Sequence, residues 1–288
     1  MTFRPDVKLD PGQVQDRRGR RVRGGGIALG GGLGGLVILA LILLMGGNLG
    51  DLGGLGVGTP ETGPVSSELA SECTTGADAN ERQDCRIVGT VNSLRAYWAD
   101  AFTGANQQFA EPETVLFTDQ VSTQCGAASS AVGPFYCPVD QTIYIDLGFF
   151  DQLESQFGAQ GGAFAEEYVL AHEYGHHVQN LLGLLDAGRD AGAEGGAVRT
   201  ELQADCFAGV WGGNAVDTGF LQPLTQEQIG QALDAASVIG DDRIQEKTQG
   251  QVDPETWTHG SAEQRQEWFG IGLEQKSADA CNTFEADI

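Results

Sequence analysis

The chain has 288 residues, with 40 Asp and Glu against 16 Lys and Arg, a formal charge of −24 and 43 glycines. This length suits one domain or two small ones, and 41% hydrophobic residues can form a buried core. The acidic balance argues against general nucleic-acid binding, which needs a basic surface. We interpret the excess of acid as a soluble surface.

The uneven distribution of charge indicates a membrane anchor near the N-terminus. Residues 1–23 carry seven Lys or Arg against three acidic residues, whereas residues 24–50 carry no charge. A helix over residues 27–47 would be roughly 31 Å long, at ~1.5 Å per residue, which is enough to cross a bilayer core. We therefore predict a transmembrane helix over residues 24–47, although glycines weaken its first half.

A cleavable signal peptide is the alternative interpretation of this uncharged run. The hydrophilic lead and the absence of an Ala-x-Ala-like site before Asp51 favour an uncleaved anchor. By the positive-inside rule, the arginines before the run keep the N-terminus cytoplasmic and place the rest of the chain outside. We expect residues 1–23 to form a disordered basic tail on anionic lipid, and the Gly-rich residues 48–70 to form a flexible linker.

The cysteines agree with an exported protein. Six is an even number, and the cysteines fall into two close pairs and one distant pair. A structural metal site that uses cysteine is the alternative, but the chain has no Cys-x-x-Cys motif. Among about fifteen possible connectivities, we expect pairing in chain order: Cys73 with Cys85, Cys125 with Cys137, and Cys206 with Cys281.

Residues 71–288 have the apolar patterning of one α+β domain, in which a small sheet precedes a helical half. Apolar residues at positions 91, 94, 98, 101 and 102 predict a helix. Residues 114–118 predict a short strand. Residues 142–146 alternate in polarity and predict a strand with one exposed face.

The remaining elements follow in chain order. Residues 125–137 are a loop of small residues that a disulfide could close, and residues 149–157 predict a short helical stretch. A long amphipathic helix is predicted over residues 163–182, ended by Gly183. The chain after Thr200 is rich in predicted helix.

The residues with the clearest chemistry lie on the long helix. His172-Glu173-Tyr174-Gly175-His176 is a His-Glu-x-x-His motif, and two histidines four positions apart lie on one helical face, where both can reach one metal ion. Glu173 is offset by about 100° and can reach a water at the metal without acting as a ligand. The alternative, two ordinary buried histidines, does not account for the uncharged residues around the motif.

A catalytic zinc needs a third protein ligand, and Glu201 is the best candidate. In Glu201-Leu-Gln-Ala-Asp205 two carboxylates share one helical face, so Asp205 can accept the free ring N–H of a ligand histidine. Either carboxylate could instead be a solvated surface acid. His177 points off the ligand face and is expected to pack or form hydrogen bonds.

Several strings of the chain resemble the neutral zinc metallopeptidase family of bacteria. They are His172-Glu-Tyr-Gly-His-His-Val-Gln-Asn180, Cys125-Gly-Ala-Ala-Ser-Ser-Ala-Val-Gly-Pro-Phe-Tyr-Cys-Pro138, Glu201-Leu-Gln-Ala-Asp-Cys-Phe-Ala-Gly209 and Thr258-His-Gly260. The resemblance covers about residues 90–285 and the layout of basic head, Gly-rich span and domain. It implies a membrane-anchored, zincin-like metallopeptidase with one zinc ion per chain. The Glu-x-x-x-Asp element resembles that of thermolysin-like gluzincins.

These parts predict a mechanism for hydrolysis of a peptide bond. Zinc held by His172, His176 and Glu201 would activate a water, with Glu173 as the general base. His259 lies in a Gly-flanked loop and is our candidate for stabilising the oxyanion, with Tyr144 and Tyr174 in reserve. The strand over residues 142–146 could pair with an extended substrate, or could be a plain core strand.

We therefore predict a membrane-anchored zinc metallopeptidase that acts on extracytoplasmic proteins or peptides. One alternative is a catalytically silent zinc-containing module that binds partners or acts like a chaperone in the cell envelope, and another is a metal hydrolase of a non-peptide bond. A calcium loop is not indicated, because Asp241 and Asp242 lack the alternating spacing of its ligands.

Overall fold

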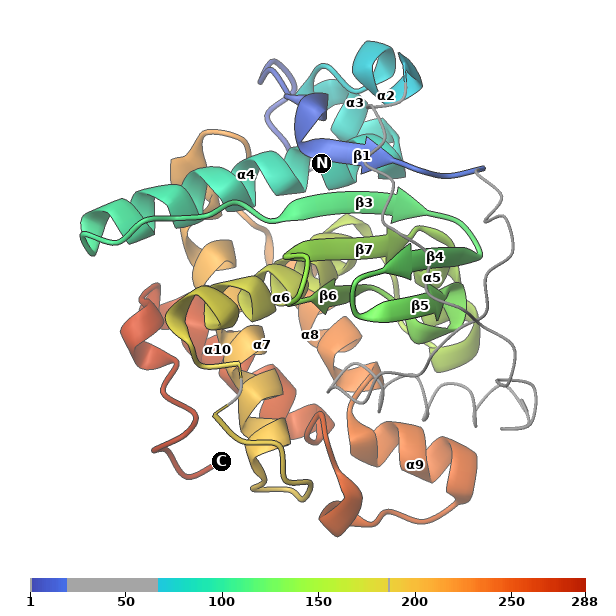
Figure 1. The fold of residues 1–288 in the computed structure, drawn as a ribbon, viewed down its shortest axis with the longest axis vertical. Helices are drawn as coiled ribbons and strands as arrows, with labels where there is room; N and C mark the ends of the chain where they lie inside the picture. Colours follow the sequence, from blue (N-terminus) through green and yellow to red (C-terminus); the bar gives the residue numbers. More distant parts are fainter. Residues whose placement is uncertain (1, 20–66, 186) are drawn as a thin grey trace.

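The computed structural model describes residues 2–19, 67–185 and 187–288, which form an α+β fold with a four-stranded sheet (Figure 1). The strand order is β1-β3-β7-β6; the first three are parallel and β6 is antiparallel to β7. A separate hairpin joins β4 to β5. The strands are β1 (Val14–Asp16), β3 (Glu113–Phe117), β4 (Gln120–Thr123), β5 (Gly126–Ser129), β6 (Phe135–Cys137) and β7 (Thr142–Asp146).

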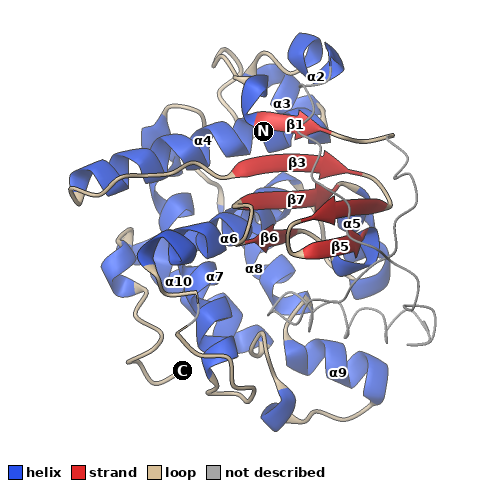
Figure 2. Cartoon of the chain, viewed as in Figure 1, coloured by secondary structure: helices blue, strands red, loops and turns tan. Residues whose placement is uncertain are grey.

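Helices cover the sheet and build the other half of the molecule (Figure 2). The first three, α2 (Ser67–Glu72), α3 (Gly76–Glu81) and α4 (Gln83–Gly104), precede β3. After the sheet come α5 (Gly148–Gln152), α6 (Ala163–Leu182), α7 (Gly196–Asn214), α8 (Gln226–Val238), α9 (Asp241–Gln249) and α10 (Ala262–Gln275). Helix α6 lies between the two halves and packs against α4, α7, α8 and β6, so most of its surface is buried.

The long helix has the predicted bounds, and Gly183 at its end has a left-handed φ of 71°. The predicted strands at residues 114–118 and 142–146 are also confirmed. The expected exposed face of the second strand is wrong, because every residue from Thr142 to Asp146 is buried. This strand, β7, lies inside the sheet between β3 and β6.

The N-terminal segment is folded, so the prediction of a disordered tail over residues 1–23 is wrong for residues 2–19. Val14–Asp16 adds β1 to the sheet beside β3, in a register that pairs Gln15 with Val115. Phe3 is fully buried, and its ring occupies the space beside Gly89 of α4, where a Cβ atom would meet it at 2.6 Å. The backbone N–H groups of Thr2 and Phe3 both donate to Asn80 Oδ1, at 2.9 and 3.0 Å.

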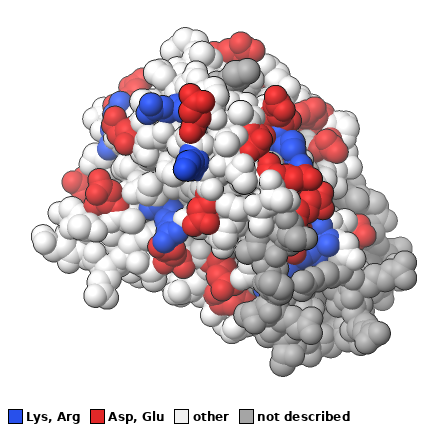
Figure 3. Space-filling model, turned by 90° about the horizontal axis from the view of Figure 1, so that it is seen from above, with Lys and Arg blue, Asp and Glu red and all other residues white. Residues whose placement is uncertain are grey.

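Two arginines of this segment, Arg17 and Arg18, are paired with protein groups. Arg18 forms ion pairs with Asp16 and Asp84 at 2.8 and 3.0 Å, and Arg17 donates to Gln15 at 2.9 Å. On the face seen from above, basic side chains lie beside acidic ones (Figure 3). These two arginines therefore contact groups of the fold, and not the lipid that we expected.

The predicted transmembrane helix over residues 24–47 lies outside the described residues, as does the linker up to residue 66. Helix α2 begins at Ser67, so part of the predicted linker, residues 67–70, is helical. Among the described helices, none combines the length and apolar character needed to span a bilayer.

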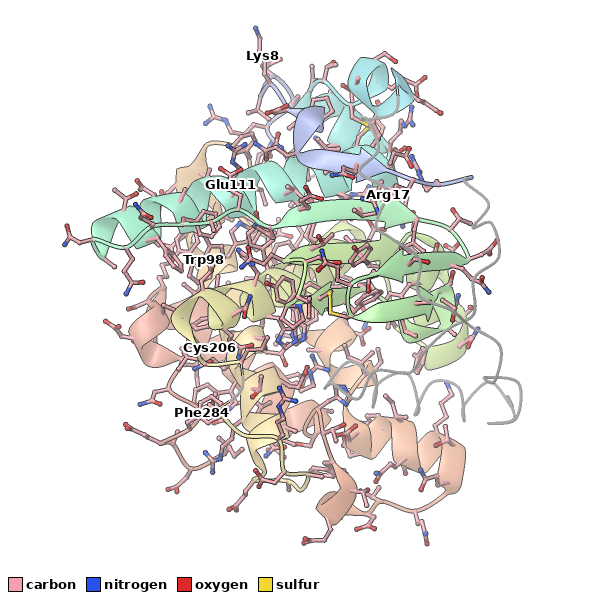
Figure 4. The ribbon with its side chains drawn as sticks, in the orientation of Figure 1. Lys8, Arg17, Trp98, Glu111, Cys206 and Phe284 are labelled. Carbon is pink, nitrogen blue, oxygen red and sulfur yellow. A yellow bond between two sulfur atoms is a disulfide. The ribbon has the colours of Figure 1, made fainter. Side chains whose placement is uncertain are left out.

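The three disulfides pair in the expected order. Each S–S bond is present: Cys73–Cys85, Cys125–Cys137 and Cys206–Cys281. The last joins α7 to the C-terminal segment after α10, 75 residues further along the chain. Cys206 lies in the helical half of the molecule (Figure 4).

Candidate metal centre

Helices α6 and α7 bring together the three residues predicted to bind metal. His172 and His176 lie one turn apart on α6, with ring centroids 4.7 Å apart and ring planes at 86°. On α7, the Glu201 carboxylate lies 3.2 Å from His172 Nε2 and 3.6 Å from His176 Nε2. One donor atom from each residue lies within 4.8 Å of the other two. Two imidazoles and a carboxylate are a donor set that fits a catalytic zinc.

The close approach of the two helices depends on Gly175. A Cβ atom at this position would lie 2.9 Å from the carbonyl oxygen of Ala204 and 3.0 Å from its Cα atom. Ala204 lies on α7, within one turn of Glu201. The absence of a side chain at Gly175 therefore lets α7 come near enough for Glu201 to face the two histidines.

Asp205 fixes the orientation of His172. The His172 Nδ1–H group donates to Asp205 Oδ1 at 2.7 Å, which leaves the Nε2 lone pair for a metal. Asp205 is fully buried and also accepts hydrogen bonds from the Tyr168 hydroxyl at 2.5 Å and from Arg265 Nε at 2.8 Å. Burial alone would raise the pKa of Asp205, but the Arg265 and His172 charges outweigh it and hold the pKa at about 2.

Gln179 plays the same geometric role for His176. The His176 Nδ1–H group donates to Gln179 Oε1 at 2.9 Å, so its Nε2 atom also faces Glu201. Sequence analysis missed this residue. Its position three residues after His176, on the same helical face, is the signal that could have identified it.

The charges at the site favour uptake of a cation. Burial alone would raise the pKa of Glu201, but the neighbouring histidines outweigh it and keep the carboxylate ionised. Burial would lower the pKa of His172, yet Asp205 and Glu201 raise it to about 10. Metal binding must therefore displace a proton, as is usual for histidine ligands.

Glu173 lies beside the ligands and is 8% exposed. Burial raises its pKa, and the His176 and His172 charges offset this only in part. A carboxylate with a raised pKa is suited to accepting a proton from water and returning it.

His259 lies in the loop before α10 and is held by Asp241 at the start of α9. Its backbone N–H donates to Asp241 Oδ2 at 2.7 Å, and its Nδ1 atom lies 3.2 Å from Asp241 Oδ1. Burial lowers the pKa of His259, but Asp241 and the more distant Glu201 outweigh it and raise the pKa. Sequence analysis missed the contact between Asp241 and His259, because the two residues are 18 positions apart in the chain.

The other polar candidates lie away from the ligands. His177 donates from Nε2 to the Ala110 carbonyl at 2.6 Å and accepts from the Tyr136 hydroxyl at 3.0 Å, in agreement with a packing role. Tyr144 donates to Asp140 at 2.9 Å, and Tyr174 lines a different cavity with Arg95 and Glu111. These contacts give neither tyrosine a place beside the candidate ligands.

The sheet presents β6, rather than β7, at the edge near α6. Strand β7 is paired on both sides and cannot accept a further strand, so the suggested role of residues 142–146 in pairing with a substrate is wrong. Strand β6 is the outer strand of the described sheet and packs on α6. The Tyr136 backbone is close enough to Glu173 to affect the pKa of that carboxyl.

Comparison with known proteins agrees with this geometry. Residues 4–284 match the model of the family described as "Putative neutral zinc metallopeptidase". The chain belongs to this family. The match includes most of the N-terminal segment as well as α6 and α7.

Two groups of curated relatives are similar to the chain, one at higher identity and the other over more of its length. Uncharacterized protein Rv2575 of Mycobacterium tuberculosis is 54% identical over 225 residues, which are 75% of each chain, and Mb2605 of Mycobacterium bovis gives the same values. Uncharacterized protein YpfJ of Escherichia coli is 39% identical over 287 residues, which are 96% of each chain. No solved structure matches the chain.

Proposed function

We propose that this protein is a zinc-dependent peptidase that hydrolyses peptide bonds of proteins or peptides outside the cytoplasm. The observation that carries the proposal is the convergence of His172, His176 and Glu201 on one point, with Glu173 beside them on α6. Membership of the metallopeptidase family supports it. When bound, zinc supplies Lewis-acid chemistry, because it polarises a carbonyl and lowers the pKa of water.

The protein's own groups divide the proton transfers and the stabilisation of charge. Glu173 takes a proton from the attacking water and returns it to the departing nitrogen of the substrate. His259, oriented by Asp241, donates a hydrogen bond to the oxyanion that forms at the attacked carbonyl. An extended substrate pairs with the outer edge of β6, which holds its backbone beside Glu173.

The test is the substitution Glu173→Gln, which keeps the shape of the side chain and removes the base. We expect loss of peptide hydrolysis by at least ~100-fold, with zinc content unchanged by elemental analysis. Wild-type protein that holds zinc but cleaves no member of a peptide library would overturn the proposal. In that case, an unchanged cellular phenotype of the Gln variant would favour a binding role.

We further propose that the protein acts outside the cytoplasm and is attached to the membrane through residues 24–47. Three disulfides support an oxidising compartment, and the uncharged run supports attachment. In this proposal the N-terminus lies on the same side of the membrane as the metal centre, in place of the cytoplasmic N-terminus expected from the sequence. Residues 2–19 pack on the metallopeptidase domain, and a membrane cannot separate β1 from β3.

A further inference from the structure

A row of buried amides connects His176 to the C-terminal segment. Gln179 accepts from His176, and its own Nε2 group donates to the Thr200 carbonyl at 2.7 Å and to Gln203 Oε1 at 3.0 Å. Gln203 Nε2 then donates to the carbonyl of Cys281 at 2.8 Å. Each of these residues except His176 is at most 4% exposed. The row therefore runs through the protein interior from α6, across α7, to the chain after α10.

The hydrogen bonds in this row have one direction. Carbonyl oxygens can only accept, so the NH₂ group of Gln203 must face Cys281 and its oxygen must face Gln179. The NH₂ group of Gln179 is then fixed in turn, and its oxygen is left for His176. Reversing one amide would bring two donors or two acceptors together in a buried place, which is costly.

The far end of the row is firmly held. Cys281 forms the disulfide with Cys206 of α7. Two residues further on, the Thr283 hydroxyl donates to the Arg199 carbonyl at 2.7 Å, and Arg199 Nη1 donates to the Ala286 carbonyl at 2.8 Å. The Cys281 carbonyl is therefore a fixed acceptor.

We propose that Gln179 and Gln203 are positioning residues that, with the disulfide-held carbonyl of Cys281, set the tautomer and orientation of His176 for zinc. This inference rests on the proposed zinc site and assigns a role in it to the C-terminal segment. The carbonyl of Cys281 selects the direction of the Gln203 amide, and the Thr200 carbonyl together with the Gln203 oxygen selects that of the Gln179 amide. The two amides keep the proton of His176 on Nδ1 and its Nε2 lone pair towards Glu201.

The first test is Gln179→Met in the full-length protein, with zinc affinity measured by competition with a chelating dye. Methionine has a similar shape and no acceptor for the histidine N–H, so we expect an affinity loss of about 10- to 100-fold. The Co²⁺-substituted protein should show a changed visible spectrum, since the His176 ring is free to rotate. Gln228→Met is the matched control, because Gln228 is also buried but lies at the start of α8 and donates to Thr2.

The second test asks whether the row acts as a unit. Gln203→Met leaves the His176–Gln179 contact intact, so a smaller loss of zinc affinity is expected, and the two substitutions together should be non-additive. If Gln179→Met does not fold, Gln203→Met alone tests the positioning role. Replacing both Cys206 and Cys281 with Ala should weaken zinc binding, whereas replacing both Cys73 and Cys85 should not.

These outcomes separate the inference from the proposed function. Absence of zinc from the wild-type protein would contradict both the proposed function and the positioning role. A wild-type protein that binds zinc, together with Gln179→Met and Gln203→Met variants whose affinity and Co²⁺ spectrum equal those of Gln228→Met, would overturn only the positioning role.

Discussion

His172 is oriented by an ionised carboxylate, whereas His176 is oriented by a neutral amide. A carboxylate acceptor increases the basicity of the imidazole that donates to it. Asp205 provides this carboxylate and is itself balanced by Arg265, which is 3% exposed. The cost of losing Asp205 should therefore appear both in metal affinity and in the stability of the fold.

Asp205→Asn tests this coupling. It leaves the buried Arg265 without its anionic partner, so the free energy of unfolding of the metal-free protein should fall by about 3–5 kcal/mol. Zinc affinity should fall by about 10- to 100-fold. Urea unfolding and chelator competition measure the two effects. Asp242→Asn is the control, because this carboxylate is 26% exposed, accepts the Ala262 N–H and lies 3.8 Å from the exposed Arg243. Equal stability of the two variants would contradict the prediction.

Glu167 is a second buried carboxyl group, and Thr2 and Arg86 are the polar groups that act on it most strongly. Burial raises its pKa to about 8, although the Thr2 hydroxyl and the Arg86 charge lower it in part. The folded protein therefore binds more protons here than the unfolded chain between pH 4.5 and 8. Across that window, stability should fall as the pH rises, by about 1.4 kcal/mol per pH unit from this group.

Glu167→Gln removes this titration. Urea unfolding of the metal-free variant at pH 5 to 9 should show a higher free energy of unfolding than wild type at the alkaline end, and little difference at pH 5. If the free energy of unfolding had the same pH dependence in both proteins, the raised pKa of Glu167 would be refuted.

At the scale of elements, α6 is fixed to the sheet by His177, on the side away from the ligands. The imidazole links the Ala110 carbonyl before β3 to Tyr136 of β6. Burial lowers the pKa of His177 to about 4, with the Ala110 hydrogen bond opposing it. The folded state thus keeps this histidine neutral where the unfolded chain protonates it.

The contribution of His177 to stability is complete above pH 6.5 and is lost as the pH falls from 6.5 towards 4. We expect the free energy of unfolding of the metal-free protein to decrease by about 1.4 kcal/mol per pH unit from this group. His177→Gln, which does not titrate, should have a shallower acid limb in urea titrations at pH 7, 6 and 5. Identical slopes would count against a neutral buried histidine.

Local patterns predicted the elements whose signal lies within a few turns of chain. Periodicity and Gly183 gave the bounds of α6, and the spacing of four residues placed Asp205 on the face of α7 that meets His172. Strand β1 has three residues in a charged stretch, and its partner lies about a hundred residues away. Its place in the sheet depends on tertiary contacts that no local pattern records. The same holds for Arg265, which reaches Asp205 across 60 residues.

At the scale of the whole molecule, the N-terminal segment is an integral part of the domain. Thr2, Phe3 and Val14 are buried against elements that follow residue 67. Lys8 lies at the outer surface of this segment (Figure 4). The segment and the metal centre must therefore share one side of any membrane.

Single cysteines test the shared compartment. All six native cysteines are in disulfides, so Lys8→Cys, or Arg243→Cys on α9, would supply the only free thiol. A membrane-impermeant maleimide applied to intact cells should label both variants or neither, and both should react after lysis. Labelling of only one in intact cells would show that the two parts are separated.

Gly175 has a consequence for how the motif itself is understood. The middle positions of His-Glu-x-x-His are written as if they were free to vary, but here one of them sets the spacing between the two ligand-bearing helices. Even a methyl group at that position would push α7 away from α6. Glu201 would then move away from the two histidines, which would stay in place on α6. The geometry of the three candidate ligands thus depends on a residue that is not itself a ligand and that has no side chain.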